Sequence, residues 1–595
     1  MNDFVNYLNS TNNVGGNSTG SLAERQVKSS YYDDVKVDRN LGRYITSCIM
    51  NNDHRTFILT GHAGDGKTSI LVQVLKSLNR LAQGEGLQVE KEYADFFYVK
   101  DMSEVSADRQ VSVLRQALEA PARGKTSLLI SNTGPLLKTF NQLVTEVRAG
   151  KGIAYSSQDE ARLQSKLLCQ LDENKDDPIV IDGFSFMLVN IARVDNVPFA
   201  TKILKNILEP KLWSVCDNCA CAGRCPVKHN REIVAAQFDR VGEFVENFYR
   251  YLYEHDKRMT IRQMMGQISY AMTGNLTCQY IMTHYLKEPF FNYNFANLFF
   301  GYHGTTPAKD SLQINAIQQI QNLGLDRVAL DVDYKLFVKQ DYSCFAPGIQ
   351  EEIRAMLTKS RKHYQSIRED QKDNEKANKT EMNNRRAIRR FYLMFSLFED
   401  ERTLERLLNQ IFGASYSDYR KMILQKQGKY ELNKLRDKIF EAMYLKNTGF
   451  LPNDKNELPL TLRREDDVFQ SVMIVLGQVE KSRLSVIQTS TKSIFEDIEG
   501  KRKLYLRMSG NKVEEFPLSL PLVTYFIDVI AGAISSNNNP ALTHGIAQLD
   551  AKMLDVFRED ACEDEEGCEL TVVINTTSGQ VITHFNIERS RLEIG

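Results

Sequence analysis

The feature that most constrains this 595-residue chain is the segment GHAGDGKT at residues 61–68, which matches the pattern G-x-x-x-x-G-K-[ST] in full. The apolar residues 56–60 directly before it predict a β-strand. Apolar residues at helical spacing from Ile70 to Leu81 predict a helix directly after it. A glycine-rich turn between a strand and a helix is typical of a loop that binds phosphate groups.

Each residue type in this segment has a physical role in holding a nucleoside triphosphate. The glycines allow backbone conformations that turn successive N–H groups toward an anion, and the following helix adds its positive N-terminal end. Lys67 would place a charge between the β- and γ-phosphates, and the Thr68 hydroxyl would reach Mg²⁺. We therefore expect ATP and Mg²⁺ to bind at Gly61, Gly64, Asp65, Gly66, Lys67, Thr68 and Ser69.

Hydrolysis also needs a carboxylate near the metal and a group that orients the attacking water. The best candidate is Asp101, which follows an apolar strand predicted at residues 96–99, with Glu104 as the water-positioning acid. Asp101 could instead cap the next helix, and Asp182 is a rival after a second apolar run. Asn132, after another predicted strand, could sense the γ-phosphate or simply form a turn.

Three further patterns bear on the nucleotide site. Residues 174–177 read N-K-x-D, but they follow a polar, helix-like segment, so guanine specificity is set aside. Arg193 and Arg262 are candidates for an arginine that contacts the nucleotide, although either could be a surface or helix-pairing residue. The sequence contains no nuclease signature.

Strand-like and helix-like segments alternate over the first third of the chain. Apolar runs at residues 56–60, 96–99, 127–130 and 178–181 predict a parallel sheet with helices on both faces, an α/β P-loop NTPase core. The predicted organisation is a mobile N-terminal arm at 1–40, the ATPase core at 41–210, a cysteine cluster with a helical lid at 211–320, a charged linker at 321–390, and a mostly helical C-terminal domain at 391–595 that ends in a small β-hairpin.

Charge and hydropathy exclude several classes of protein. The net charge is −1, which excludes a uniformly basic nucleic-acid binder but not a local basic face. Residues 359–390 carry eleven Lys or Arg against five Asp or Glu, which indicates either a solvated helix or linker or a contact with a phosphate backbone.

The longest apolar run, residues 522–534, is too short to span a membrane and contains Asp528. With no signal peptide, we expect a cytoplasmic protein.

Four cysteines lie within ten positions, and thiolates at this spacing typically converge on a soft cation. Zn²⁺ is the commonest such ion, and an iron–sulfur cluster is the alternative. Cys278 or His229 could replace one thiol. The predicted zinc site would staple a loop-rich insertion, with ligands from Cys216, Cys219, Cys221 and Cys225.

Several strings in order resemble one family. They are the phosphate loop, KDMSE at 100–104, ISNTGPLL at 130–137, NIARVDN at 190–196, the cysteine segment, TIR at 260–262 and TGNLTC at 273–278. Together they resemble the DptF/DndF-type ATPase subunit of bacterial DNA phosphorothioation-dependent restriction systems. The resemblance is clearest over about residues 40–290, and Cys221 is an addition to the three-cysteine pattern.

The resemblance implies a role in antiviral defence. Such subunits act with companion restriction-complex proteins, one of them a further ATPase with helicase-like features, on DNA that lacks phosphorothioate modification. The chain would bind and hydrolyse ATP and contact DNA through the complex, and it could form a homo-oligomer. The alternatives are a nucleotide-gated scaffold with little turnover, or a zinc-dependent nucleic-acid-binding protein of another defence system.

Overall fold

The computed structural model describes residues 1–12, 28–284, 290–369, 374–398, 400–452, 456–462, 471–490, 493–498, 501–532, 540–558, 568–576, 579–588 and 591–594. The chain divides into two compact units. The first unit holds Met1–Glu399 together with the short segment Ser493–Glu499. The second holds Asp400–Lys492 and Gly500–Gly595.

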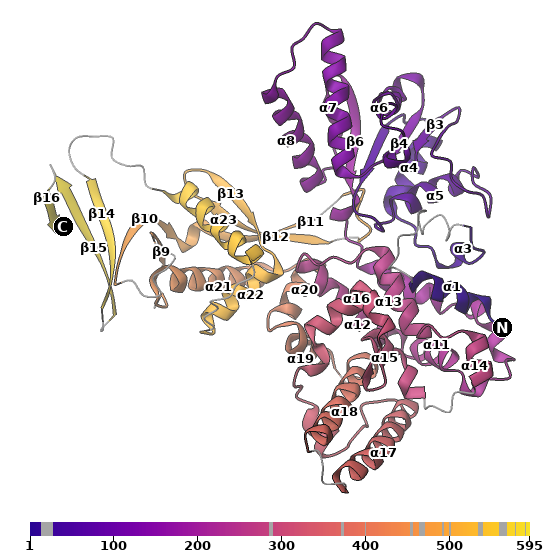
Figure 1. Ribbon diagram of the computed structural model, residues 1–595. Coiled ribbons are helices and arrows are strands. Elements are labelled where there is room, and N and C mark those ends of the chain that lie inside the picture. The colour runs from indigo at the N-terminus through magenta and orange to yellow at the C-terminus, as the bar shows by residue number, and fades with distance from the viewer. Residues whose placement is uncertain are drawn as a thin grey trace. The chain divides into compact units, whose positions relative to one another are not determined.

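The N-terminal part of the first unit contains a six-stranded sheet, in the order β2-β3-β4-β1-β6-β5. Figure 1 labels its strands β3, β4 and β6. The four inner strands run parallel, and the edge strands β2 and β5 pair antiparallel with their neighbours. The result is a mixed sheet with helices, of the α/β class. The strands are β1 (Thr56–Thr60), β2 (Glu90–Glu92), β3 (Phe96–Val99), β4 (Thr126–Ile130), β5 (Ile179–Ile181) and β6 (Phe184–Asn190).

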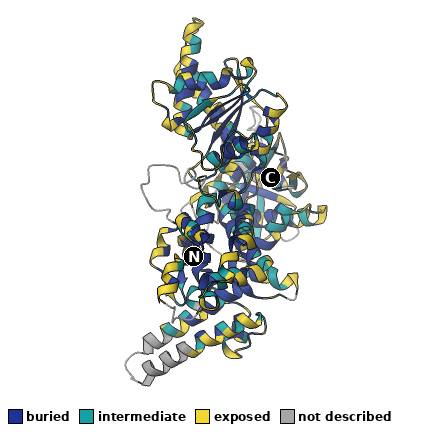
Figure 2. Ribbon diagram, turned by 90° about the vertical axis from the view of Figure 1, so that its right-hand side faces the viewer, coloured by how far each residue is buried: buried dark blue, intermediate teal, exposed yellow. Residues whose placement is uncertain are grey.

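Both faces of this sheet are covered by helices, because alternate residues of its strands join two different cores. Phe57 and Leu59 of β1 pack with residues of α4 (Asn40–Met50) and α5 (Lys67–Ser77). Ile58, between them, packs with α6 (Gln110–Glu119), α7 (Thr133–Gly150) and α8 (Ser157–Glu173). Every residue of β1, β3 and β4 is buried (Figure 2), as expected for inner parallel strands.

The sequence located most of these strands correctly. The predictions at 56–60 and 96–99 match β1 and β3, and β4 is one residue longer than the predicted 127–130. The fourth prediction is wrong in its role, because β5 is an antiparallel edge strand and β6 is the fourth parallel one. A tight turn at Asp182 and Gly183, both with positive φ, reverses the chain between them.

The N-terminus is not the mobile arm that its Asn- and Ser-rich composition predicted, as far as the described residues show. Asp3–Asn12 forms helix α1, and Phe4, Val5 and Leu8 are buried. The helix packs against α13 (Ile261–Thr273), and the Asn9 side chain donates to the Leu276 carbonyl at 3.0 Å. Residues 13–27, also assigned to the arm, lie outside the described residues.

The remainder of the first unit is almost entirely helical, in agreement with the predicted helical lid. The longest helix between residues 198 and 340 is α12, which is strongly amphipathic and buries Phe244 and Phe248. The helices are α3 (Tyr32–Val35), α9 (Pro198–Ile207), α10 (Ser214–Asp217), α11 (Pro226–Ala236), α12 (Phe238–Glu254), α13, α14 (Cys278–His284), α15 (Phe295–Phe299) and α16 (Asn315–Leu323), and β7 (Tyr302–His303) pairs with β8 (Thr306–Pro307).

The basic stretch is part of the first unit and not a linker, so that prediction is wrong. It contributes to α17 (Pro347–Glu369) and α18 (Asn374–Phe395), which contact each other. Arg390 is buried and bonds to Asp326 at 2.7 Å, and Arg389 bonds to Asp333 at 2.5 Å. These two arginines therefore hold the unit together instead of facing a phosphate backbone.

The second unit contains more strand than the sequence predicted, so a mostly helical domain is wrong. The helices are α19 (Glu401–Phe412), α20 (Tyr416–Leu424), α21 (Lys429–Thr448), α22 (Leu520–Ile530) and α23 (Pro540–Phe557). The strands are β9 (Glu457–Thr461), β10 (Val472–Glu480), β11 (Leu484–Ser490), β12 (Arg502–Ser509), β13 (Val513–Pro517), β14 (Cys568–Thr576), β15 (Gly579–Glu588) and β16 (Arg591–Ile594). The predicted terminal hairpin is present as β14 and β15, with β16 added to it.

The first nine residues of the apolar run at 522–534 lie in α22, which is 11 residues long, and residues 533–534 lie outside the described residues. It buries Leu522, Val523 and Phe526 on one side, while Asp528 is not among its buried residues. Across the described ranges, no helix combines the length and the apolar character that a membrane span requires.

Candidate functional site

The loop between β1 and α5 is shaped by glycines at positions where a side chain would not fit. Gly61, Gly64 and Gly66 have φ angles of 144°, 90° and 88°, a range that side-chain-bearing residues rarely adopt. A Cβ on Gly64 would lie 3.0 Å from Thr260 Oγ1, and one on Gly66 would lie 3.3 Å from Ile261 Cδ1. The helix begins at Lys67, so the loop lies at the positive end of α5.

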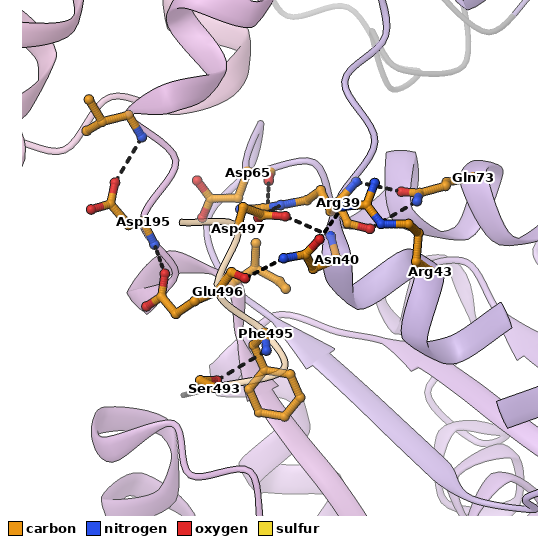
Figure 3. A network of polar contacts seen from close by, with 12 residues as sticks. Arg39, Asn40, Arg43, Asp65, Gln73, Asp195, Ser493, Phe495, Glu496 and Asp497 are labelled. Atoms are coloured by element: carbon orange, nitrogen blue, oxygen red, sulfur yellow. Dashed lines mark hydrogen bonds and ion pairs between the residues drawn. The ribbon is translucent and has the colours of Figure 1, made fainter. Parts of the chain in front are cut away.

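Asp65 holds the loop in shape from beneath. Its side chain is fully buried, and Oδ2 accepts from the His62 backbone N–H at 2.9 Å. Oδ1 accepts from Arg258 Nη1 at 2.7 Å, and the Asp65 carbonyl accepts from Arg39 Nη1 at 3.1 Å (Figure 3). Asp65 is therefore a structural brace of the loop and does not line the pocket described next.

The Lys67 amine reaches back across the loop. Nζ donates to the Gly61 carbonyl at 2.5 Å and to the His62 carbonyl at 3.0 Å. Burial lowers the pKa of Lys67 from its ordinary value, while the carboxylates of Asp65 and Asp101 oppose that shift. A cation held over the loop by carbonyl oxygens can be redirected to an anion that enters the loop.

A pocket of about 220 Å³ opens above the loop. Its polar lining combines the loop with Asp101, which follows β3, Asn132, which follows β4, and Arg262 on α13. Burial lowers the pKa of Arg262. Its apolar and aromatic lining residues are Tyr7, Tyr32, Val35, Val37, Ile203, Ile261 and Met265. A phosphate chain suits the polar residues, and a flat aromatic base suits the apolar ones.

The structure brings most of the predicted nucleotide residues together. Those that line the pocket are Gly64, Gly66, Lys67, Thr68, Ser69, Asp101 and Asn132. Asp101 also caps a short 3₁₀ helix, since its Oδ1 accepts from the Ser103 N–H at 2.9 Å and from Ser103 Oγ at 2.8 Å. The alternative that Asp101 caps the next helix is therefore confirmed, and Asp101 lines the pocket as well. Both of these bonds use the same carboxylate oxygen.

Other candidates lie elsewhere. Glu104 is 41% exposed and pairs with Lys100 at 2.7 Å. Asp182 lies in the β5–β6 turn and pairs with Arg148 at 3.1 Å, and Arg193 forms an exposed ion pair with Asp172. None of these side chains is among the described residues that line the pocket.

Two residues of the N-K-x-D string make structural contacts. The Asn174 side chain accepts from the Asn190 backbone N–H at 2.8 Å, and Asp176, at the variable position of the string, accepts from Ser493 Oγ at 2.6 Å. Neither residue is among those described as lining the pocket.

Sequence reasoning missed three residues that shape the site: Arg39, Arg258 and Tyr32. Arg258 carries a weak signal, because it lies four positions before Arg262 in the segment that begins the lid helix. Arg39 and Tyr32 lie in the segment predicted to be mobile, and only the folded chain shows that they line or brace the pocket.

The cysteine segment has less regular secondary structure around it than the loop between β1 and α5. It spans the four-residue α10 and a three-residue 3₁₀ turn, and its four thiols are all partly exposed. Among the described residues, no group of three or more His, Cys, Asp or Glu side chains is placed to hold a metal ion. Asn2 nevertheless contacts two distant thiols, donating to Cys216 Sγ at 3.3 Å and accepting from Cys278 Sγ at 3.8 Å. The alternative ligand His229 bonds to Glu352 at 2.5 Å.

Comparison of the chain with protein-family models, with curated proteins and with solved structures returned no match.

Proposed function

We propose that this chain is a P-loop ATPase that binds Mg·ATP in the pocket above the loop between β1 and α5. The observation that carries the proposal is the convergence of Lys67, Thr68, Asp101 and Asn132 on one pocket at the carboxyl ends of parallel strands. Ligands of parallel α/β sheets bind at this edge. The sequence motif supports the same proposal, because its residues form part of the pocket lining.

In this mechanism the chain's residues bind and orient the triphosphate. The loop N–H groups and the end of α5 hold the phosphates, and Lys67 exchanges its carbonyl partners for phosphate oxygens. Thr68 and Asp101 would hold Mg²⁺, which neutralises charge on the phosphates. Asn132 would orient the γ-phosphate. The apolar and aromatic lining residues of the pocket would contact the adenine base.

The test is binding of a labelled adenine nucleotide to the full chain in the presence of magnesium, together with phosphate release. We expect Lys67→Ala to weaken binding by about 100-fold, because it removes a buried charge that bonds to phosphate. Lys175→Ala, which removes an exposed lysine paired with Glu173, is the matched control and should bind normally. A wild-type chain that takes up no nucleotide would refute the proposal.

A second function, a nucleotide-gated scaffold with little turnover, is favoured by one observation. Glu104, the predicted water-positioning acid, pairs with Lys100 and is not among the described pocket residues. Phosphate release measured with and without DNA separates the two: tight binding with no turnover under either condition supports the scaffold.

We further propose that the chain acts as the DptF/DndF-type subunit of a restriction complex on DNA lacking phosphorothioate modification, with companion subunits that include a helicase-like ATPase. The support is the order of the motif strings together with the pocket into which KDMSE and ISNTG each contribute a residue, Asp101 and Asn132. Purification with co-expressed neighbouring genes tests this. Recovery of the chain alone, with no companion protein or DNA, would contradict it.

The zinc site also remains a proposal, with ligands among Cys216, Cys219, Cys221 and Cys225. The contacts of Asn2 with Cys216 and Cys278 favour Cys278 over Cys221 as one ligand, because they bring α14 to the cysteine segment. Its role would be structural, tying α1, α10 and α14 together. The metal content of the purified chain tests this proposal.

A further inference from the structure

Arg39, the residue before α4, is fixed in place by the helix that follows the phosphate loop. Its backbone N–H donates to Gln73 Oε1 at 2.9 Å, and Gln73 Nε2 donates back to the Arg39 carbonyl at 3.0 Å (Figure 3). Gln73 lies on α5. The close approach depends on Gly42, where a Cβ would lie 2.4 Å from Gln73 Oε1. We therefore expect a displacement of α5 to move Arg39 with it.

The Arg39 side chain is 3% exposed and uses only part of its donor capacity. Nη1 donates to the Asp65 carbonyl of the phosphate loop at 3.1 Å, and Nε donates to Asp497 Oδ2 at 3.3 Å. The guanidinium lies 5.0 Å from the centre of the Phe199 ring. Within the described part of the chain, Nη2 is buried and has no hydrogen-bond partner, and Arg39 lines the pocket. A buried donor left unpaired is costly, so a hydrogen bond from Nη2 to a ligand oxygen would stabilise the bound state.

Asp497 comes from a distant part of the sequence. It lies in the loop between β11 and β12, two strands of the second unit that pair up to Ser490 and Arg502. The described residues of this loop, 493–498, belong to the first unit. Asp497 is 2% exposed, and its Oδ1 accepts from the Asn40 backbone N–H at 2.7 Å.

Several other contacts fix this loop beside Asp497. Phe495 is 1% exposed and joins the core that also holds α4 and α5 residues. The Glu496 carbonyl accepts from Asn40 Nδ2 at 2.6 Å, and Glu496 Oε2 accepts from the Asp195 N–H at 3.2 Å. At the other end, Asp176 accepts from Ser493 Oγ and from the Ile494 N–H, at 2.6 and 3.0 Å. The loop is held by both apolar and polar contacts, so Asp497 has a defined position.

We propose that Arg39 is a nucleotide-binding residue, donating its unused Nη2 group to an oxygen of the bound nucleoside triphosphate, and that Asp497 is its positioning residue. The inference rests on the proposed function, because it assigns a further contact in the same pocket. It has one consequence beyond that pocket: nucleotide binding and docking of the β11–β12 loop favour each other, since such coupling is reciprocal.

The first test measures the affinity of the full chain for labelled Mg·ATP. Arg39→Lys keeps the charge but replaces the three nitrogens of the planar guanidinium by one, which cannot reach the separate partners of Nε, Nη1 and Nη2, so affinity should fall by about 10-fold or more. Asp497→Asn should weaken binding by about 3- to 10-fold, because the guanidinium loses its ionic partner. Arg193→Lys and Asp172→Asn, the same changes in an exposed pair, are the controls and should bind as wild type. Unchanged affinity in both Arg39→Lys and Asp497→Asn would overturn the inference.

The second test separates positioning from mere stability. Backbone hydrogen exchange in residues 493–498 should slow when Mg·ATP is added to wild type, and should not change in Arg39→Lys at saturating nucleotide. If Asp497→Asn does not accumulate as folded protein, Asp176→Asn loosens the same loop without touching Arg39, and it should also weaken nucleotide binding. Exchange that is insensitive to nucleotide in wild type would overturn the coupling.

The two proposals fail in different ways. If wild type takes up no labelled nucleotide, the proposed function fails. If wild type binds nucleotide and Lys67→Ala does not, while Arg39→Lys binds as wild type, the proposed function stands and this inference fails.

Discussion

The phosphate loop at 61–66 and the cysteine segment at 216–225 are both recognised in the sequence by the spacing of a few glycines or cysteines. In the folded chain they differ in the secondary structure and the contacts that surround them. The loop is joined to β1 and to the 11-residue α5, both of which contribute to the buried core. It is also braced by Arg39 and Arg258 through Asp65. The cysteine segment has only a four-residue helix and a 3₁₀ turn, and its thiols are partly exposed.

The two segments differ in the source of the free energy that fixes their backbone conformation. The ends of the phosphate loop are fixed by elements that would fold for hydrophobic reasons alone, so the loop shape follows from the chain itself. In a metal-binding segment, the ligand supplies much of that free energy, and the binding is part of the folding. A spacing motif therefore predicts geometry better where the flanking elements belong to the core.

The largest effect that would sharpen this comparison is metal removal. We expect about one zinc per chain on purification, and we expect its removal by a chelator to expose residues 214–226 to protease, because a structural zinc contributes roughly 10 kcal/mol. Cys225→Ser should lose the metal, whereas Cys169→Ser, at an exposed cysteine outside the segment, should keep it. Comparison of Cys221→Ser with Cys278→Ser identifies the fourth ligand. A chain purified without metal would break the comparison.

The second effect concerns the brace of the phosphate loop. Asp65→Ala leaves Arg258 without its partner at a fully buried carboxylate, so the free energy of unfolding should fall by about 3 kcal/mol. The fluorescence of Trp213, the only tryptophan and a buried residue of the first unit, can follow denaturant unfolding. Asp172→Ala removes an exposed partner of Arg193 and should leave the midpoint unchanged. Equal midpoints for the two variants would show that the loop is not braced this way.

These contrasts also show how much of the fold the sequence could predict. Strands β1, β3 and β4 were located because each is a short segment with at least three consecutive apolar residues, the signal of an inner parallel strand. The edge strand β5 has the same apolar signal over 179–181, so the sequence assigned it to the parallel set. Its antiparallel pairing depends on the turn at Asp182 and Gly183, and the apolar character of residues 179–181 does not predict that turn.

The sequence predicted those site residues that belong to a local motif. It did not predict those that reach the site only through tertiary contacts. Lys67 and Asp101 each follow a local pattern, so the sequence is enough to assign both of them to the pocket. Arg39 and Asp497 are 458 residues apart and meet only in the folded chain. The composition of 2–20 predicted mobility, yet Phe4 and Leu8 bury against the lid because helix α1 is amphipathic.

The third effect tests whether Asp101 is more than a helix cap. Asp101→Asn keeps an oxygen for the Ser103 contacts but loses the charge that would hold Mg²⁺, so turnover should fall by about 100-fold with a smaller loss of nucleotide affinity. Glu104→Gln is the control, since Glu104 pairs with Lys100 and lies outside the described pocket lining. If Glu104→Gln reduced turnover as much as Asp101→Asn, the assignment of the two acids would have to be reversed.

The smallest effect compares a single methyl group in the two regions. Gly66→Ala places a Cβ at φ 88°, which costs about 1–2 kcal/mol in a side-chain-bearing residue, and brings it to 3.3 Å from Ile261 Cδ1. Gly223→Ala places a Cβ in the cysteine segment where no heavy atom lies within 4 Å, so it should be neutral or slightly stabilising. Thermal unfolding measures both. A loss of stability in Gly223→Ala equal to that in Gly66→Ala would mean that the cysteine segment is as tightly specified as the phosphate loop.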